Sequence, residues 1–184
     1  MIKTKNEELN RPSLEEFKKM EKSPFIFLLD NVRSALNVGS IFRTADAFSA
    51  SGIYLCGITA SPPNRDIEKT SLGSVKSVDW KYFNTSEEAV QELKRNNFTI
   101  LAVEQAHQSV SLNAFHPEKE KKYAFIFGHE VFGVEEKLMK MTDGCIEIPQ
   151  SGTKHSLNVA VSAGIIAWDF FAKRSNQGIE KQLY

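Results

Sequence analysis

Short, continuous apolar runs recur along the chain, and most are separated by segments with a helical pattern. Runs of this length are typical of strands buried on both faces of a parallel sheet. The expected strands are residues 25–29, 53–56, 78–83, 98–103, 123–127 and 145–148. Helices are expected between them, at about residues 38–48, 66–71, 85–95 and 133–141. This alternation predicts an α/β domain with a parallel sheet flanked by helices on both faces.

The last helix is expected to begin abruptly after a polar loop. Residues 146–148 end an apolar strand, Pro149 opens the loop, and Ser156 and Asn158 are expected in the first turn of a helix that runs to about Phe171. That helix is apolar on nearly every side, so it must be buried on more than one side. In a chain of 184 residues, this favours a subunit interface as well as a core. The unpaired first amide groups of such a helix can bind a small molecule.

The domain is expected to span residues 25–172, with a short tail at 173–184 and an extension at 1–24. The extension contains a capping-box pattern, Ser13 followed by Glu16, which predicts a short helix. Two interpretations of it stay open. It is either a solvated helix packed on the domain or an arm that grips RNA with Lys18, Lys19 and Lys22.

Composition narrows the class of protein. No apolar run reaches the roughly 18–20 residues that span a bilayer, and the amino terminus lacks the apolar core of a signal peptide. Cys56 and Cys145 are isolated, without disulfide or metal-ligand spacing, so a cytoplasmic protein without a bound metal is expected. The 23 basic and 23 acidic side chains give a net charge of zero. An RNA partner would therefore need a local basic surface.

Candidate chemistry is concentrated where the predicted strands end. Ligands in open α/β sheets bind just beyond those carboxyl ends. The polar positions there are Asn31, Arg33, Asn37 and Arg43 after the first strand, Glu104 after the fourth, Gly128, His129 and Glu130 after the fifth, and residues 149–158 after the last. They form either one ligand site or a set of ordinary caps and turns. The fingerprints of dinucleotide-binding folds, phosphate loops, serine hydrolases and metalloenzymes are absent, although an enzyme acting on a small nucleotide stays open.

Arg43 is the most informative of these residues. It follows Asn37 by six positions and has the apolar neighbours Ile41 and Phe42. Arginine is seldom buried without a partner, and Glu130 is the expected one. The pair would be either structural or part of a site.

Three ordered segments carry a resemblance to a known family. They are residues 37–43 (Asn-Val-Gly-Ser-Ile-Phe-Arg), 127–130 (Phe-Gly-His-Glu) and 146–164. They resemble the three motifs of the SpoU-type, TrmH-like RNA 2'-O-ribose methyltransferases of the SPOUT superfamily. The resemblance implies methyl transfer from S-adenosylmethionine to a ribose 2'-hydroxyl of tRNA or rRNA. It also implies a C-terminal trefoil knot and a homodimer formed through the C-terminal knot helix.

The resemblance also assigns residues. Cofactor binding would fall to Gly128, Ile148, Leu157 and, less directly, Glu104, and the catalytic positions would be Asn37, Arg43, Glu130, Ser156 and Asn158. Because a guanidinium keeps its proton up to about pH 12, Arg43 is expected to bind phosphate and stabilise an oxyanion rather than act as a base.

Some positions depart from the family pattern. His129 replaces the usual asparagine, Gln150 a common methionine and Ala160 a frequent serine. The absence of a separate N-terminal substrate domain favours tRNA over rRNA. A non-catalytic RNA-binding relative with a degenerate pocket is the alternative.

Overall fold

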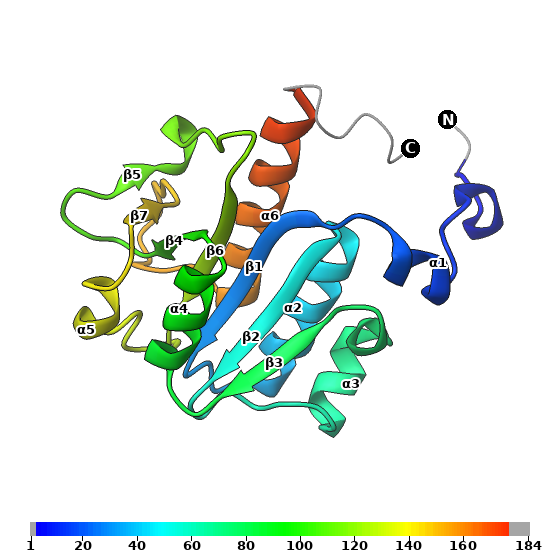
Figure 1. Cartoon of the computed structure of the whole chain (residues 1–184), viewed down its shortest axis with the longest axis horizontal. Coiled ribbons are helices and arrows are strands. Elements are labelled where there is room, and N and C mark those ends of the chain that lie inside the picture. Colours follow the sequence, from blue (N-terminus) through cyan, green and yellow to red (C-terminus); the bar gives the residue numbers. More distant parts are fainter. Residues whose placement is uncertain (1–2, 177–184) are drawn as a thin grey trace.

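The computed structural model describes residues 3–176, which form one α/β fold (Figure 1). All seven strands lie in one sheet, and every pairing between neighbours is parallel. The order across the sheet is β3-β2-β1-β6-β4-β7-β5. The strands are β1 (Ser23–Asp30), β2 (Ala50–Cys56), β3 (Trp80–Phe83), β4 (Phe98–Val103), β5 (Val110–Ser111), β6 (Lys122–Phe127) and β7 (Gly144–Glu147). The predicted parallel sheet is confirmed.

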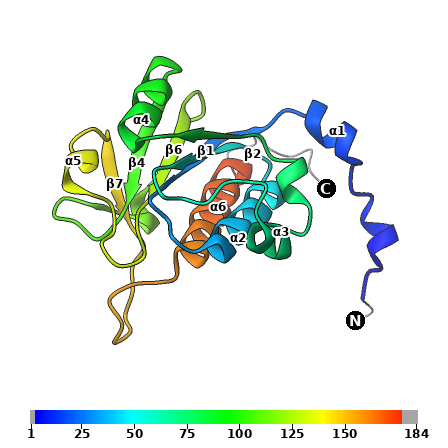
Figure 2. The ribbon, with the colours of Figure 1, turned by 90° about the horizontal axis from the view of Figure 1, so that it is seen from below.

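Helices cover both faces of this sheet, as predicted (Figure 2). One face carries α2 (Ala35–Ala47), α3 (Arg65–Ser71) and α6 (Val159–Asn176). The other carries α4 (Ser86–Arg95) and α5 (Glu136–Met139). Three short 3₁₀ helices complete the described elements: η1 (Asn6–Leu9), η2 (Ser74–Lys76) and η3 (Leu112–Ala114).

The apolar runs are continuous because the central strands are buried on both faces. Along β1, Phe25, Phe27 and Leu29 belong to the core cluster that includes α2 and α6. The alternate residues Ile26 and Leu28 belong to the cluster that includes α4 and α5. Successive side chains of a strand point to opposite faces, so both sets must be apolar.

An aromatic cluster fixes α6 against the sheet. The Phe170 ring lies 5.1 Å from that of Phe25 and 5.7 Å from that of Phe125, between ring centroids. Helix α6 also packs on α2. Two apolar residues of α6 nevertheless stay outside the core: Val161 is 51% exposed and Trp168 is 57% exposed. The expected burial of this helix on more than one side is therefore not met within one chain, and the subunit interface stays a prediction.

The N-terminal segment forms the predicted short helix, α1 (Leu14–Lys19), with the Ser13–Glu16 capping box. None of its residues is buried, and Figure 1 shows it standing away from the sheet and its helices. The interpretation as a helix packed on the domain is therefore wrong. Lys22 lies 3.2 Å from the centroid of the Phe17 ring, a local contact at the end of this helix.

Three predicted elements have different bounds from those expected. Helix α5 is confined to Glu136–Met139, shorter than the predicted 133–141, because Gly133 takes part in a tight turn. No helix or strand was expected between residues 103 and 123, yet this segment contains β5 and η3. Helix α6 begins at Val159, so Ser156 precedes it rather than lying in its first turn.

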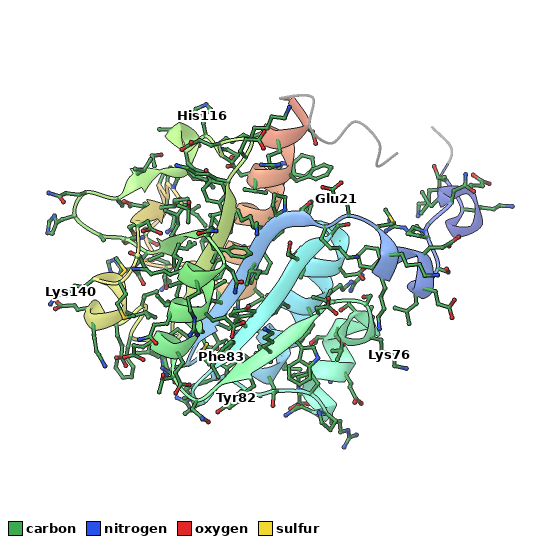
Figure 3. All side chains as sticks on the ribbon, in the orientation of Figure 1. Glu21, Lys76, Tyr82, Phe83, His116 and Lys140 are labelled. Atoms are coloured by element: carbon green, nitrogen blue, oxygen red, sulfur yellow. The ribbon has the colours of Figure 1, made fainter. Side chains whose placement is uncertain are left out.

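Three labelled side chains mark the two opposite ends of the molecule. Tyr82 and Phe83 lie at one end of the molecule, where β3 stops, whereas His116 lies at the opposite end (Figure 3). His116 is thus remote from the carboxyl ends of the strands. None of the helices described is long and apolar enough to cross a membrane.

Candidate functional site

A cavity of about 710 Å³ lies at the carboxyl edge of the sheet. It is lined by the loops that follow β4, β6 and β7 and by the start of α6. Seven of the nine residues singled out from the sequence line it: Glu104, Gly128, Glu130, Ile148, Ser156, Leu157 and Asn158.

Strand order explains why these residues meet. β6, β4 and β7 are neighbours in the sheet and run parallel, so their carboxyl ends open on the same edge. The loops after them are far apart in sequence but adjacent in space. This is the edge at which ligands bind in α/β sheets.

A tight turn after β6 forms one wall of the cavity. The backbone of His129 and Gly133 is bonded in both directions, at 3.1 and 2.8 Å between nitrogen and oxygen. Gly133 has φ of +67°, a conformation that favours glycine. A Cβ on Gly128 would lie 2.2 Å from the Gly133 carbonyl. The tight turn therefore requires glycine at both positions.

Glu104 holds the turn against the end of β4. One carboxylate oxygen accepts a hydrogen bond from the Gln105 amide at 2.8 Å, and the other accepts from the Val134 amide at 3.3 Å. A Cβ on Gly133 would lie 2.2 Å from the same carboxylate. Glu104 thus links the loop after β4 to the loop after β6.

Glu130 links that turn to the first motif. Its carboxylate accepts hydrogen bonds from the backbone amides of Arg33 and Ser34, each at 3.0 Å. Burial alone would raise the pKa of the Glu130 carboxyl, but these amide bonds outweigh it, so its pKa lies below the ordinary value. Glu130 is therefore a carboxylate at neutral pH.

Asn37 connects Glu130 to the third motif. Its amide nitrogen donates to Glu130 at 3.2 Å, and its amide oxygen accepts from the Asn158 amide nitrogen, also at 3.2 Å. The Asn158 side-chain oxygen in turn accepts from the Ala160 amide at 2.9 Å. One hydrogen-bonded chain, Asn158–Asn37–Glu130, thereby joins all three segments.

The loop between β7 and α6 is open. Residues 149–158 are all exposed, and in Figure 2 this segment runs out from the body before α6 begins. Gln105 ties it to the loop after β4 by donating to the His155 carbonyl at 2.9 Å. Asn158 caps α6 rather than lying within its first turn.

Arg43 lies elsewhere. It is exposed on α2 and lines a second cavity, of about 500 Å³, together with Lys69 of α3. The carboxylate of Glu130 is bonded to Arg33, Ser34 and Asn37 instead. The expected Arg43–Glu130 pair within one chain is therefore wrong. The reason is the face of α2: Val38, Ile41, Phe42 and Ala45 point into the core, and Arg43 lies off that stripe.

Sequence reasoning missed several contributors. The backbone amides of Arg33 and Ser34 carried no signal, because any residue type supplies an amide. Gln105 and Phe132 also line the cavity. Gly133 offered a signal that was overlooked, since glycine is the residue type that most readily takes the positive φ of a tight turn.

A parallel sheet with a mixed polar and apolar cavity at its carboxyl edge defines an α/β protein that binds a small organic ligand. Within that class, the chain belongs to the SpoU rRNA Methylase family, whose sequence model matches residues 24–168.

Individual relatives agree. The chain is 31% identical over 172 residues to the tRNA (guanosine(18)-2'-O)-methyltransferase of Thermus thermophilus, covering 94% of this chain and 87% of that protein. The crystal structure of the A. aeolicus TrmH/SpoU tRNA modifying enzyme superposes with a TM-score of 0.79 at 27% identity, covering 90% and 83%. The S. meliloti rRNA methyltransferase with bound S-adenosylmethionine superposes with 0.76 at 28% identity. The match covers 87% of this chain but 60% of that one.

The chain is therefore an RNA 2'-O-ribose methyltransferase of the SpoU family. Its cofactor is S-adenosylmethionine.

Proposed function

We propose that this protein methylates a ribose 2'-hydroxyl of tRNA. The observation that carries the proposal is the Asn158–Asn37–Glu130 chain, which joins the three motif segments at the edge of the cavity. The choice of tRNA rests on sequence similarity. The chain is 31% identical over 172 residues to a tRNA methyltransferase of Thermus thermophilus and 28% identical to the rRNA methyltransferase of S. meliloti.

The cavity fits the cofactor. Its volume of about 710 Å³ lies within the range of ~300–1,000 Å³ that is usual for small-molecule sites. Ile148 and Leu157 give apolar surface to the adenosine portion, and Gly128 lets backbone approach closely. Glu104 keeps the two walls together. The bound cofactor supplies an electrophilic methyl group on a sulfonium.

The remaining task is to activate a poor nucleophile. A ribose hydroxyl attacks only when its developing negative charge is stabilised or its proton removed. Arg43 does this by binding the adjacent phosphate and the oxyanion. Asn37, Glu130 and Asn158 hold the three motif segments together, and Ser156 lines the cavity. Since its guanidinium keeps its proton, Arg43 is not the base, and the hydroxyl proton passes to solvent water at the open cavity as the methyl group is transferred to the oxygen.

Arg43 reaches the cavity of a second copy of the chain. Its position outside the cavity of its own chain supports this arrangement. So does the apolar surface that α6 leaves uncovered, Val161 and Trp168, with Gly164 between them. A Cβ on Gly164 would meet nothing within 4 Å, so a second helix can approach closely there. A homodimer through α6 would also cover residues 149–158.

A trefoil knot is the proposed topology of this region. Support comes from the path of the chain: β7 is separated from β1 by β4 and β6, yet α6 returns to pack on α2, which follows β1. We take residues 25–172 as the methyltransferase domain, 1–24 as an extension and 173–184 as a tail. Residues 177–184 of that tail lie outside those described. A cytoplasmic location accords with a tRNA substrate.

Activity is tested first with radiolabelled S-adenosylmethionine and bulk tRNA from a strain that lacks the gene. Calorimetry should give about one cofactor site per chain. Arg43→Ala should lower kcat by roughly 10²–10³-fold while cofactor affinity stays unchanged. Arg65→Ala, an exposed arginine on α3, is the matched control. Cofactor binding without methyl transfer to any RNA fraction would instead support a non-catalytic RNA-binding protein.

A mixed dimer tests where Arg43 acts. One chain carries Arg43→Ala, and the other carries Leu157→Asp, which blocks the cavity at a residue that is already 37% exposed. If each site combines a cavity with Arg43 of the partner subunit, the purified mixed dimer keeps one intact site of two, or about half the wild-type activity. No activity in the mixed dimer would mean that Arg43 serves its own chain.

A further inference from the structure

We propose that the rings of His129 and Phe132 form a platform on which a nucleobase of the RNA substrate stacks. The inference rests on the proposed function, because it assigns the platform to the RNA that approaches the same cavity. It adds two side chains that the three motifs do not assign to substrate binding.

Phe132 stands out among the described residues by its exposure. The residue is 80% exposed, although it lines the cavity. The ring of His129 lies 4.8 Å from it between centroids, with the planes tilted by 35°. A large apolar ring that is exposed yet paired presents a free face to a ligand.

The ring is held in place without being buried. The turn that carries it is closed by the two backbone bonds between His129 and Gly133. Glu130 fastens the turn to the start of α2, and Glu104 fastens its end to β4. Holding an aromatic ring on a rigid, exposed turn reduces the entropy cost of binding, because little is left to order.

The imidazole contributes to this rigidity and to recognition. His129 Nδ1 accepts a hydrogen bond from the Val131 amide at 3.0 Å. In the neutral ring, Nδ1 is then the acceptor and Nε2 carries the proton. The Nε2–H is a donor that a base edge or phosphate oxygen can accept.

A nucleobase fits this platform better than the other two candidate occupants. The cofactor belongs deeper, between Gly128, Ile148 and Leu157, whereas Phe132 is at the exposed mouth. A second copy of the chain is expected on α6. In that arrangement Arg43 of the partner subunit binds RNA phosphate at the cavity that Phe132 lines, which brings RNA to the ring. Bases of single-stranded RNA stack on exposed aromatic rings in this way.

Direct binding of tRNA tests the platform. Phe132→Ala should raise the Kd for bulk tRNA by about 5- to 140-fold, the range expected for loss of one base–aromatic stack. Phe132→Tyr keeps the ring and should stay within about threefold of wild type. His129→Ala removes the supporting ring and should have a smaller effect of the same sign. Tyr82→Ala is the control: that ring is 47% exposed at the end of β3 and should leave the Kd unchanged (Figure 3).

Each of the following results would refute the proposed platform. An unchanged tRNA Kd in Phe132→Ala, or an equal loss in Tyr82→Ala, removes it. A loss of S-adenosylmethionine affinity in calorimetry would assign Phe132 to the cofactor. Dissociation of the dimer in sedimentation would assign it to the subunit interface. The experiment measures tRNA binding rather than methyl transfer. A wild-type protein that binds tRNA but transfers no methyl group would therefore refute the proposed function. The Kd values of the variants would still show whether Phe132 stacks on a base.

Discussion

Replacing Glu130 with glutamine tests the link between the second motif and the first. The carboxylate accepts from two backbone amides, each at 3.0 Å. A glutamine has one acceptor oxygen, and its NH₂ group would face an amide donor, so one of the two bonds and the charge are lost. Hydrogen bonds to charged groups contribute about 1.5–3 kcal/mol.

Solvent reduces that value here, because Glu130 is exposed. We expect Glu130→Gln to lower the free energy of unfolding by about 1–2 kcal/mol. For a chain of this size, that is a fall in Tm of roughly 2–8 °C. Urea unfolding followed by circular dichroism measures the change in the free energy of unfolding. Glu120→Gln, an exposed carboxylate in the loop before β6, is the control and should change the unfolding free energy by less than ~0.5 kcal/mol.

The pH dependence has a definite sign. The pKa of Glu130 is lower in the folded chain than its ordinary value of 4.5. Its contribution is therefore fully present above about pH 4.5 and is lost as pH falls through the folded pKa. The difference between wild type and Glu130→Gln should be constant from pH 7 to about 5.5 and should shrink below 4.5. Equal stability at pH 7, or a difference that persists unchanged in acid, would refute this account of Glu130.

Two further predictions concern the cavity wall and a buried thiol. Gly133→Ala should destabilise the fold by at least about 1–2 kcal/mol and weaken S-adenosylmethionine binding in calorimetry, because φ is +67° and the new Cβ would displace Glu104. Gly152→Ala, where a Cβ meets nothing within 4 Å, should change neither quantity. Burial raises the pKa of the Cys56 thiol to about 12, so iodoacetamide at pH 8 should label it only after denaturation. Mass spectrometry that finds native Cys56 labelled as fast as unfolded Cys56 would contradict the burial argument.

The sheet was predictable because burial on both faces leaves an unbroken apolar run, as in residues 25–29. The first residues of the strands were harder to predict. β2 begins at Ala50 rather than at 53, because Ala50 and Gly52 pair with β1 but carry almost no apolar side chain. Backbone pairing of this kind leaves no mark on hydrophobicity.

The helix boundaries failed for a different reason. Asn158 was expected within the first turn of α6, but its side chain caps the helix by bonding the Ala160 amide. A polar residue at the start of an apolar run fits a cap as well as a first turn. The helix start therefore depended on where the preceding loop is held, which one sequence does not reveal.

The candidate site was predictable as a set of segments but not as a network. Polar residues after strands indicated one sheet edge, and seven of the nine residues that the family resemblance assigns line one cavity. The bond between Asn158 and Asn37 spans 121 positions and requires the strand order. Arg43 could have been placed better: the spacing of Val38, Ile41, Phe42 and Ala45 already defines the buried stripe of α2 and leaves Arg43 outside it.

The contacts that hold the site together differ from those that stabilise the fold. Phe25, Phe125 and Phe170 belong to the apolar core that stabilises the fold. The motif segments are held together by Asn37, Glu130 and Asn158, and the loop at residues 149–158 is exposed throughout. A total stability of ~5–15 kcal/mol tolerates the loss of one such bond. The position of a catalytic group does not, because a displacement of about 1 Å can lower a rate by about 100-fold. Substitutions at Asn37, Glu130 or Asn158 should therefore reduce the rate of methyl transfer far more than they reduce the stability of the fold.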